Sequence, residues 1–495
     1  MNPKCPTPSP RNSILPARQL AEQVFSRTAG APLVSGNSLR LLKDARENYP
    51  AWIEALLSAK KFIHFESYII HEDEVGRRFA EILTAKSREG VKVRLLYDWV
   101  GGFGKTSGRF WKHLREAGVE VRCFNPPRWD SPLGWITRDH RKMIAVDGQV
   151  AFVTGLCVGR RWAGEPQKGI EPWRDTGVEV RGPALFDLER SFDEVWATMG
   201  EPLPPEEVPS PDQIQPAGTA ALRVIGTVPA TAGLYRLDLL IAALARRSLW
   251  LTDAYFIGST SYVQALRAAA RDDVDVRLLV PGATDIPLLR GISRAAYQPL
   301  LEAGVRVFEW NGPMIHAKTA VADGRWARVG STNLNIASWM GNYELDVAVE
   351  DQAFARAMEN MYQEDLRSST EVVISLRGKV RLSSTSPRRF FPERPFSSGG
   401  VGRVGIRAIR LGGTVGAAIT NHRLLGAAEA KITGLAGLLL LAVALLMIFW
   451  PRWATLPLIG FCGWIAFSLL IRTFKLFREK KSDEQEDEIS ATERR

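Results

Sequence analysis

The sequence is short of cysteine and histidine: its 495 residues include four of the first and six of the second. The cysteines contain no C-x-x-C pair, so their spacing does not indicate a disulfide framework, and it fits a reducing, cytosol-facing environment. No pair of potential ligands has the helical or knuckle spacing of a zinc centre. We therefore expect neither a metal ion nor another cofactor. The cysteines are Cys5, Cys123, Cys157 and Cys462.

The N-terminus lacks an apolar segment. Its first residues, MNPKCPTPSPRNS, hold no apolar core of the kind that a cleaved export signal needs. Proline, serine and other polar residues are frequent over residues 1–35, and this composition predicts a flexible leader.

Acidic residues are outnumbered, 54 against 64 Lys and Arg, which gives a net charge of +10. Such an excess favours an anionic partner, either nucleic acid or acidic lipid, without deciding between them. The length predicts two or three folding units instead of one ordinary domain.

Long uncharged stretches are confined to the C-terminal region. Residues 432–450 and 454–471 carry no Asp, Glu, Lys or Arg, and each stretch approaches the roughly 20 helical residues that cross a bilayer. We predict two transmembrane helices, 432–471, joined as a hairpin; the alternative is a buried helical hairpin of a soluble domain. Basic residues crowd both outer flanks, whereas the link holds Arg452 alone. The positive-inside rule therefore places residues 1–431 and the charged tail 472–495 in the cytoplasm.

Residues 373–431 are predicted to form a basic linker beside the membrane. Positions 377–410 contain nine Arg or Lys and one acid, Glu393. This stretch is either a solvated linker or a segment that lies on anionic headgroups, where each basic residue contributes about 1 kcal/mol.

Helical and strand patterns alternate from about residue 36, which predicts an α/β layer fold. The second half of the chain repeats the order of the first: VRLLV (276–280) follows VRLLY (93–97), and LEAGVRVF (301–308) follows LREAGVEV (114–121). We interpret this as an internal duplication. The predicted fold is two α/β/α sandwich halves, 36–200 and 219–372, related by a pseudo-twofold axis and joined by a Pro- and acid-rich linker, 201–218.

The repeat includes a shared frame: His, one residue, Lys, four residues, Asp-Gly. It reads HRKMIAVDG from His140 and HAKTAVADG from His316. Each Asp-Gly pair lies between apolar residues, a strong signal for a β-hairpin turn. Residues two apart in a strand share a face, so His140 should lie beside Lys142 and His316 beside Lys318. From this pattern Asp147 and Asp323 are turn formers or ion-pair partners.

An imidazole beside an ammonium suits attack on phosphorus, because the lysine neutralises a phosphate oxygen while neutral histidine attacks or moves a proton. Two such histidines can share the work: one forms a phosphohistidine, and the other protonates the leaving alkoxide and then activates the incoming alcohol. Each also needs an orienting carboxylate. Asp175, 35 residues after His140, and Glu344, 28 residues after His316, are the candidates.

These features resemble the phospholipase D superfamily with its paired H-x-K-x4-D motifs, and most closely its bacterial cardiolipin synthases. The similarity runs from about Asn37 to about Asp365 and includes FESYII, DHRKM, WRDT, MIHAKT, VGSTNLN and NYELDV. The resemblance implies metal-independent transfer of a phosphatidyl group to phosphatidylglycerol through a covalent phosphohistidine, with His140 as the nucleophile. It also implies that each whole motif, Asp147 and Asp323 included, belongs to the catalytic set. After the second motif, Ser331 and Asn333 are candidate donors to phosphate oxygens.

The sequence departs from the family pattern in three places. Cys157 stands where relatives often have Asn, and a thiol is the poorer hydrogen-bond donor; a nucleophilic role for Cys157 is an alternative. Asn335 stands where many relatives have Asp, and the membrane hairpin is C-terminal. His64, His71 and His113 are interpreted as structural, as are Glu66, Asp98, Asp253 and Tyr255, although these four can also line the cleft.

Two further functions are compatible with the motifs. One is a phospholipase D-type phosphodiesterase or nuclease that hydrolyses phospholipid or nucleic acid; the other is a non-catalytic membrane scaffold. The basic zone lies beside the predicted membrane segment, so we expect phospholipid and an anionic membrane as partners, and not nucleic acid.

Overall fold

A single mixed β-sheet organises the protein in a computed structural model that describes residues 14–127, 136–285, 287–374 and 380–382, with isolated positions between 438 and 467. The strands follow the order β16-β15-β11-β10-β9-β12-β13-β14-β8-β1-β7-β6-β5-β2-β3-β4. From the centre outward, the order β1-β7-β6-β5-β2-β3-β4 is matched by β8-β14-β13-β12-β9-β10-β11. The antiparallel pair β1–β8 joins the two series. The strand order therefore repeats, as the sequence repeat predicts.

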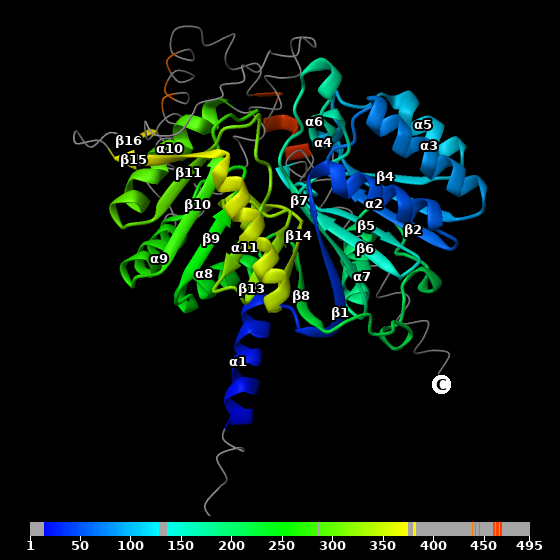
Figure 1. Cartoon of the computed structure of the whole chain (residues 1–495). Coiled ribbons are helices and arrows are strands. Elements are labelled where there is room, and N and C mark those ends of the chain that lie inside the picture. The colour runs from blue at the N-terminus through cyan, green and yellow to red at the C-terminus, as the bar shows by residue number, and fades with distance from the viewer. Residues whose placement is uncertain are drawn as a thin grey trace, which may run out of the picture.

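The first half lies on one side of this central pair and the second on the other (Figure 1). The first half comprises β1 (Val34–Lys43), α2 (Asp44–Ser58), β2 (Phe62–Ser67), α3 (Glu74–Arg88), β3 (Lys92–Asp98), α4 (Trp99–Gly102), α5 (Gly108–Glu116), β4 (Glu120–Phe124), β5 (Lys142–Val146), β6 (Val150–Thr154), α6 (Arg160–Ala163), β7 (Thr176–Arg181) and α7 (Leu185–Ala197). The short helices η3 (Pro205–Glu207) and η4 (Pro211–Gln213) lie in the linker.

The second half repeats this plan and adds two strands. It comprises β8 (Ala220–Thr227), α8 (Gly233–Leu244), β9 (Ser248–Thr252), α9 (Thr260–Arg271), β10 (Asp275–Pro281), α10 (Pro287–Glu302), β11 (Arg306–Trp310), β12 (Thr319–Ala322), β13 (Trp326–Gly330), β14 (Glu344–Val349), α11 (Gln352–Arg367), β15 (Ser369–Ile374) and β16 (Val380–Leu382). The sheet therefore continues past the predicted boundary at residue 372, into the stretch expected to be a basic linker.

Helices cover both faces of the sheet. In β3 the neighbouring side chains Leu95 and Leu96 are both buried, but they join different apolar clusters. Successive residues of a strand point to opposite faces, so both faces are covered, as is typical of strands with continuous apolar runs. One cluster includes side chains of α7 and α11 together, among them Phe192 and Phe354, and thus runs beneath both halves.

The predicted flexible leader is partly helical. Helix α1 (Ile14–Ala29) ends against the start of α8, where Arg236 Nε donates to the carbonyl oxygen of Thr28 at 3.1 Å. Ala29 and Ala31 are buried in the apolar cluster of the second half. Packing on α8 thus stabilises a segment whose composition favoured a loose chain.

The predicted membrane hairpin at 432–471 lies outside the described residues except for isolated positions, and so do most of the basic zone and the charged tail. Among the residues that the structure describes, no helix has both the length and the apolar character needed to cross a bilayer.

Candidate active site

The two motif histidines each lie just before a strand, His140 before β5 and His316 before β12, and each is held there by the opposite half. The His140 amide donates to the carbonyl oxygen of Tyr343 at 2.9 Å, and the His316 amide donates to that of Arg174 at 2.6 Å. In return, the Tyr343 amide donates to the carbonyl oxygen of Arg138, and the Arg174 amide donates to that of Met314. The two halves thus meet at the site through matching backbone bonds.

The orienting carboxylates are exchanged between the halves. His140 Nδ1 lies 2.8 Å from Glu344 Oε2, and His316 Nδ1 lies 2.7 Å from Asp175 Oδ2. The sequence-based prediction chose the right two acids but paired each with the histidine of its own half, which is wrong. Because the carboxylate takes Nδ1 as a hydrogen-bond donor, Nε2 is the ring atom suited to attack phosphorus.

Each lysine lies beside its histidine, as the two-residue spacing predicts. Lys142 Nζ donates to the main-chain carbonyl of His140, and Lys318 Nζ to that of His316. Both lysine side chains are buried. Burial lowers the pKa of Lys318 to about 8. The negative charge of Asp175 raises this pKa, and the positive charge of Lys142 lowers it. The two lysine side chains thus lie close enough for Lys142 to act on the pKa of Lys318.

Two tyrosines, one from each half, cover the histidine–lysine pairs. The Tyr68 ring centroid lies 4.8 Å from that of His140, and Lys142 Nζ lies 5.3 Å from the Tyr68 ring. Tyr255 occupies a similar position, 6.0 Å from both the His316 ring and Lys318 Nζ. Tyr255 was interpreted as structural, with a place in the cleft as the alternative, and Tyr68 was missed. An aromatic residue shortly after β2 and again after β9 was the available signal.

The two histidine–carboxylate pairs differ in charge state. Burial lowers the pKa of His316 to about 4, helped by Lys318 and opposed by Asp175. The pKa of Asp175 itself is lowered, because His316 and Lys318 outweigh the effect of burial. Burial instead raises the pKa of Glu344 to about 7 against the influence of Lys142. At neutral pH Asp175 is therefore a carboxylate, whereas Glu344 lies near the midpoint of its titration.

The aromatic surroundings of His316 explain its burial. The rings of Trp162 and Trp173 lie 5.8 and 5.6 Å from the imidazole. Both tryptophans come from the first half of the chain and are themselves buried. They exclude water from His316, which disfavours its charged form.

Of the two roles predicted for Ser331, phosphate binding or orientation of a neighbour, the contacts of its side chain support the second. Its hydroxyl donates to Glu344 Oε2 at 2.5 Å and accepts from the amide of Leu345, so it orients the carboxylate. The equivalent residue of the first half is Gly155, where an added Cβ would lie only 2.2 Å from Asp175 Oδ1. The Asp175 carboxylate therefore leaves no room for a side chain at position 155, whereas the Glu344 carboxylate accepts a hydrogen bond from Ser331.

Asn333 and Cys157 follow β13 and β6 at equivalent positions. The Asn333 side chain is buried, and its Oδ1 has no hydrogen-bond partner among the described residues. That oxygen is an acceptor, so only a hydrogen-bond donor can satisfy it. Cys157 is 1% exposed, and burial raises the pKa of its thiol. A thiol held protonated is poorly suited to the nucleophilic alternative.

The motif aspartates close hairpin turns at the far end of their strands. Asp147 and Asp323 both have φ of 54°, and each is followed by a glycine with positive φ, as a type I′ turn requires. The Asp147 carboxylate accepts from the amides of Lys60, Lys61 and Phe62 at 2.7–2.8 Å. Asp323 accepts in the same way from residues 246–248. The turn-forming interpretation is confirmed.

Of the three acids interpreted as structural with the cleft as an alternative, Asp98 and Asp253 accept hydrogen bonds from main-chain amides, whereas neither carboxylate oxygen of Glu66 has a hydrogen-bond partner among the described residues. Asp98 accepts from the first amides of α4 and from the amide of Asp139, and Asp253 accepts from the amides of Tyr255 and Leu334. Glu66 is fully buried with a pKa raised well above its usual range by burial and by Asp139.

His64 is buried between two carboxylates, 2.5 Å from Glu189 and 3.4 Å from Glu207. Burial alone would lower its pKa, but the two acids raise it to about 9. This ion pair ties β2 to α7 and to the linker, so the structural interpretation of His64 is confirmed. Within the described parts of the chain, no group of three or more His, Cys, Asp or Glu side chains is arranged to hold a metal ion.

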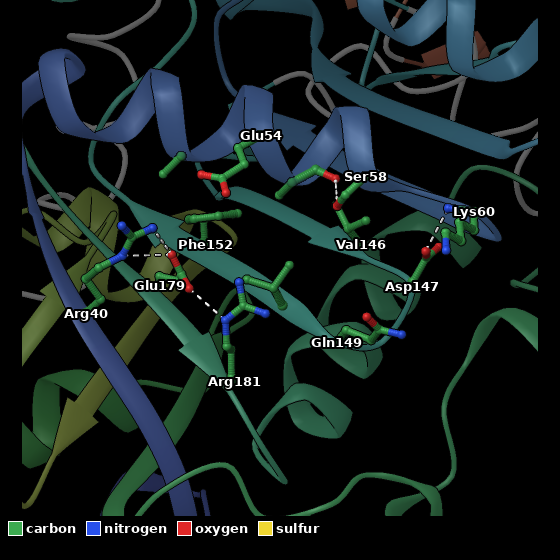
Figure 2. A pocket seen from close by; sticks show the side chains of 13 residues that line it. Arg40, Glu54, Ser58, Lys60, Val146, Asp147, Gln149, Phe152, Glu179 and Arg181 are labelled. Carbon is green, nitrogen blue, oxygen red and sulfur yellow. Dashed lines mark hydrogen bonds and ion pairs between the residues drawn. The ribbon is translucent and has the colours of Figure 1, made fainter.

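A pocket of about 540 Å³ lies beside the Asp147 turn, between α2 and the hairpin of β5 and β6 (Figure 2). Glu179 lies there between Arg40 and Arg181 and pairs with both. Strands β5, β6 and β7 run from the histidine end, at Lys142 and Thr154, to this pocket, at Val146 and Arg181. The pocket is therefore at the opposite end of the sheet from the motif histidines.

Comparison with known proteins agrees with the geometry. A family model described as "Cardiolipin synthase, PLD-like domain" matches residues 52–162 and 240–366. Cardiolipin synthase of Alkalihalophilus pseudofirmus is 32% identical over 363 residues, which cover 72% of each chain. Cardiolipin synthase A of Pseudomonas fluorescens is 33% identical over 69% of this chain and 71% of its own.

Among solved structures, phosphatidylserine synthase of Haemophilus influenzae shares the fold. The TM-score is 0.57 at 15% identity, over 71% of this chain and 91% of that one. The fold likeness and the sequence relatives agree with the two histidine–lysine motifs that meet at one site. This chain belongs to the phospholipase D superfamily, in its cardiolipin synthase branch.

Proposed function

We propose that this protein is a membrane-bound phosphatidyltransferase, a cardiolipin synthase that transfers a phosphatidyl group to the hydroxyl of phosphatidylglycerol. The observation that carries the proposal is the pair of His–carboxylate units, 2.8 and 2.7 Å, that are exchanged between the halves beside two buried lysines. The relatives that the chain resembles over more than two thirds of its length are named cardiolipin synthases. Their name supports the choice of lipid.

The first step forms a phosphohistidine. Nε2 of one histidine attacks the phosphorus of the donor lipid, the P–N bond forms, and the P–O bond to the leaving alcohol breaks. The second histidine gives its proton to the departing alkoxide. Lys142 and Lys318 neutralise the phosphate oxygens, on which charge builds up, and Asn333 adds a neutral donor.

The second step reverses the proton path. The second histidine takes the proton of the acceptor hydroxyl, the alcohol oxygen attacks phosphorus, and the P–N bond breaks. Asp175 and Glu344 stabilise whichever imidazolium forms and hold Nδ1 protonated, so that Nε2 faces the phosphorus.

Two considerations point to different nucleophiles. Family resemblance assigns the covalent adduct to His140. The pKa of about 4 leaves His316 unprotonated at neutral pH, the form that attacks, although an anionic substrate would raise that pKa. Quenching with denaturant at alkaline pH, where the P–N bond of phosphohistidine survives, followed by peptide mapping, assigns the adduct to one of the two.

We also propose that a gene duplication produced the two halves, with a pseudo-twofold axis through the β1–β8 pair. The repeated strand order and the reciprocal backbone bonds of His140 and His316 support this. The uncharged stretches at 432–471 support a membrane anchor with residues 1–431 in the cytoplasm.

The test is to incubate the purified full-length protein with phosphatidylglycerol vesicles and to identify the products by mass spectrometry. Cardiolipin and glycerol are expected. Phosphatidic acid alone would mean hydrolysis in place of transfer, and cleaved DNA without lipid turnover would contradict the proposal.

His140→Ala and His316→Ala should each abolish turnover. His113→Ala is the matched control, since His113 is an exposed residue of α5. Substantial activity in either motif variant would contradict the two-histidine scheme.

A further inference from the structure

The two orienting carboxylates share a second feature: a buried guanidinium also holds the main-chain carbonyl of each. Arg141 Nε donates to the carbonyl oxygen of Glu344 at 3.1 Å. Arg174 Nη1 donates to the carbonyl oxygen of Asp175. The two arginines are 0% and 3% exposed. A charge buried this deeply is costly unless its donors are satisfied, so each arginine is tied closely to its surroundings.

Arg141 joins three elements around Glu344. Its Nη1 donates to the carbonyl oxygen of Ser191 in α7, and its Nη2 donates to that of Thr227 at the end of β8 at 3.2 Å. Thr227 pairs with Glu344 across the β8–β14 ladder. Arg141 directly follows His140 in the chain. Glu344 is therefore bound twice by neighbouring residues: its carbonyl oxygen by Arg141 and its carboxylate by the His140 imidazole.

Arg174 performs the equivalent task for Asp175 with different partners. Both of its Nε and Nη2 groups donate to Asp365 of α11, each at 2.8 Å, and its Nη1 lies 3.2 Å from Asp44 Oδ1. Asp44 Oδ1 also accepts from the amide of Asp175 at 2.9 Å. Asp175 is thus held from its amide, its carbonyl and its side chain.

The two arginines do not occupy equivalent positions in the repeat. Ala317 stands in the second motif where Arg141 stands in the first. Tyr343 stands where Arg174 does, because the carbonyls of Arg174 and Tyr343 accept from the amides of His316 and His140. Simple duplication therefore does not explain why both carboxylates have a guanidinium on their carbonyl.

We infer that Arg141 and Arg174 are positioning residues: they fix Glu344 and Asp175 so that each carboxylate holds Nδ1 of its histidine and aims Nε2 at the phosphorus. This rests on the proposed function only in taking the two histidines as the reacting groups. Partners that orient a reacting ligand typically contribute 10–100-fold to activity, since small displacements of a reacting group are costly.

Kinetics provide the first test. Arg141→Lys and Arg174→Lys keep the charge but lose the planar fork that reaches several acceptors. Each should lower kcat about 10–100-fold with KM nearly unchanged. Arg223→Lys is the control: Arg223 is 1% exposed on β8 and pairs with Glu350, at the other end of the strand from Thr227. It should lower stability and leave kcat within about twofold. A loss confined to KM, or an equal loss of kcat in the control, would overturn the inference.

The second test needs no substrate and so separates this inference from the proposed function. In protein labelled with ¹⁵N-histidine, a low-field Nδ1–H resonance is expected for each of the two pairs; Glu344→Gln removes one and Asp175→Asn the other. The His64–Glu189 pair provides an internal reference.

Arg141→Lys should shift only the resonance assigned through Glu344, and Arg174→Lys only the one assigned through Asp175. Unchanged resonances in both variants would overturn the inference. So would a common shift that includes the His64 reference, because it would indicate general loosening. If the selective shifts occur but no lipid is transferred, the proposed function fails and the positioning role stands.

Discussion

At the scale of single residues, the site depends on acids that the chain brings from far away. His140 and Glu344 are 204 positions apart, and His316 and Asp175 are 141 apart. Each reacting unit is therefore completed only when both halves are folded against each other. Neither half by itself brings a motif histidine together with its orienting carboxylate.

Removing either carboxylate should impair catalysis without preventing substrate binding. Asp175→Asn and Glu344→Gln each keep the shape of the side chain but remove the charge that stabilises the imidazolium. We expect kcat to fall about 10²–10⁴-fold in each, by analogy with the loss of the acid in a Ser-His-Asp triad, with a small change in KM. Steady-state kinetics on phosphatidylglycerol vesicles check this. A less than twofold effect in either variant would contradict the orienting role.

Activity should follow a bell-shaped pH profile. The raised pKa of Glu344, about 7, means that its carboxylate is present above pH 7 and is lost as the pH falls through it. The lowered pKa of Lys318, about 8, means that its ammonium is present below pH 8 and is lost as the pH rises. The optimum should lie between the two, with apparent values that belong to the coupled site.

The matched variant for this profile is Glu344→Gln, which should keep the alkaline limb and lose the acid limb. Measuring kcat/KM of both proteins from about pH 5 to 10 checks the assignment. An acid limb that stays in place in Glu344→Gln would mean that another group sets it.

At the scale of the elements, the two Asp-Gly hairpins were predictable because their signal is local. The turn residues must adopt positive φ, and only a few residue types do so readily. The α1 helix was missed because its stability comes from packing on α8, and the composition of residues 1–35 does not reveal that contact.

The turn aspartates should matter for stability and not for chemistry. Asp147→Ala removes an acceptor from three amides and leaves alanine at φ of 54°. We expect a loss of about 1–3 kcal/mol in the free energy of unfolding. The kcat per folded molecule should stay within about twofold, because the turn is at the opposite end of β5 from Lys142.

Urea unfolding and kinetics on the same samples test this. Asp147→Asn is the graded control, since asparagine tolerates positive φ and keeps one acceptor oxygen. A large fall in kcat with unchanged stability would return Asp147 to the reacting groups.

At the scale of the whole molecule, the sequence repeat predicts much of the fold and part of the site. The repeated landmarks predict matching halves, and the strand order repeats accordingly. His140, Lys142, His316 and Lys318 are found from the repeated frame, because both copies keep the same residues at the same spacing. The exchange of Asp175 and Glu344 does not, because spacing within a half cannot tell which half will face which histidine. The orienting role of Ser331 depends on the pairing of β13 with β14, which places its hydroxyl beside Glu344.

The last prediction concerns attachment to the membrane, where two segments should contribute differently. The uncharged stretches at 432–471 should hold the full-length protein through the hydrophobic effect, which salt does not weaken. The stretch 383–410 contains six arginines and one acid. It should attract anionic lipid through charge, which salt screens.

Vesicle sedimentation separates these contributions with three proteins: the full chain, a chain ending at residue 431 and a chain ending at residue 382. The full chain should stay with vesicles of any charge at low and high salt. The chain ending at 431 should bind only anionic vesicles and only at low salt. The chain ending at 382 still includes β16 but lacks the six arginines of 383–410. It should bind vesicles weakly at both low and high salt. Release of the full chain by salt would contradict the hairpin. Salt-resistant binding of the chain ending at 431 would place an apolar attachment before residue 432, since salt screens the charges of 383–410.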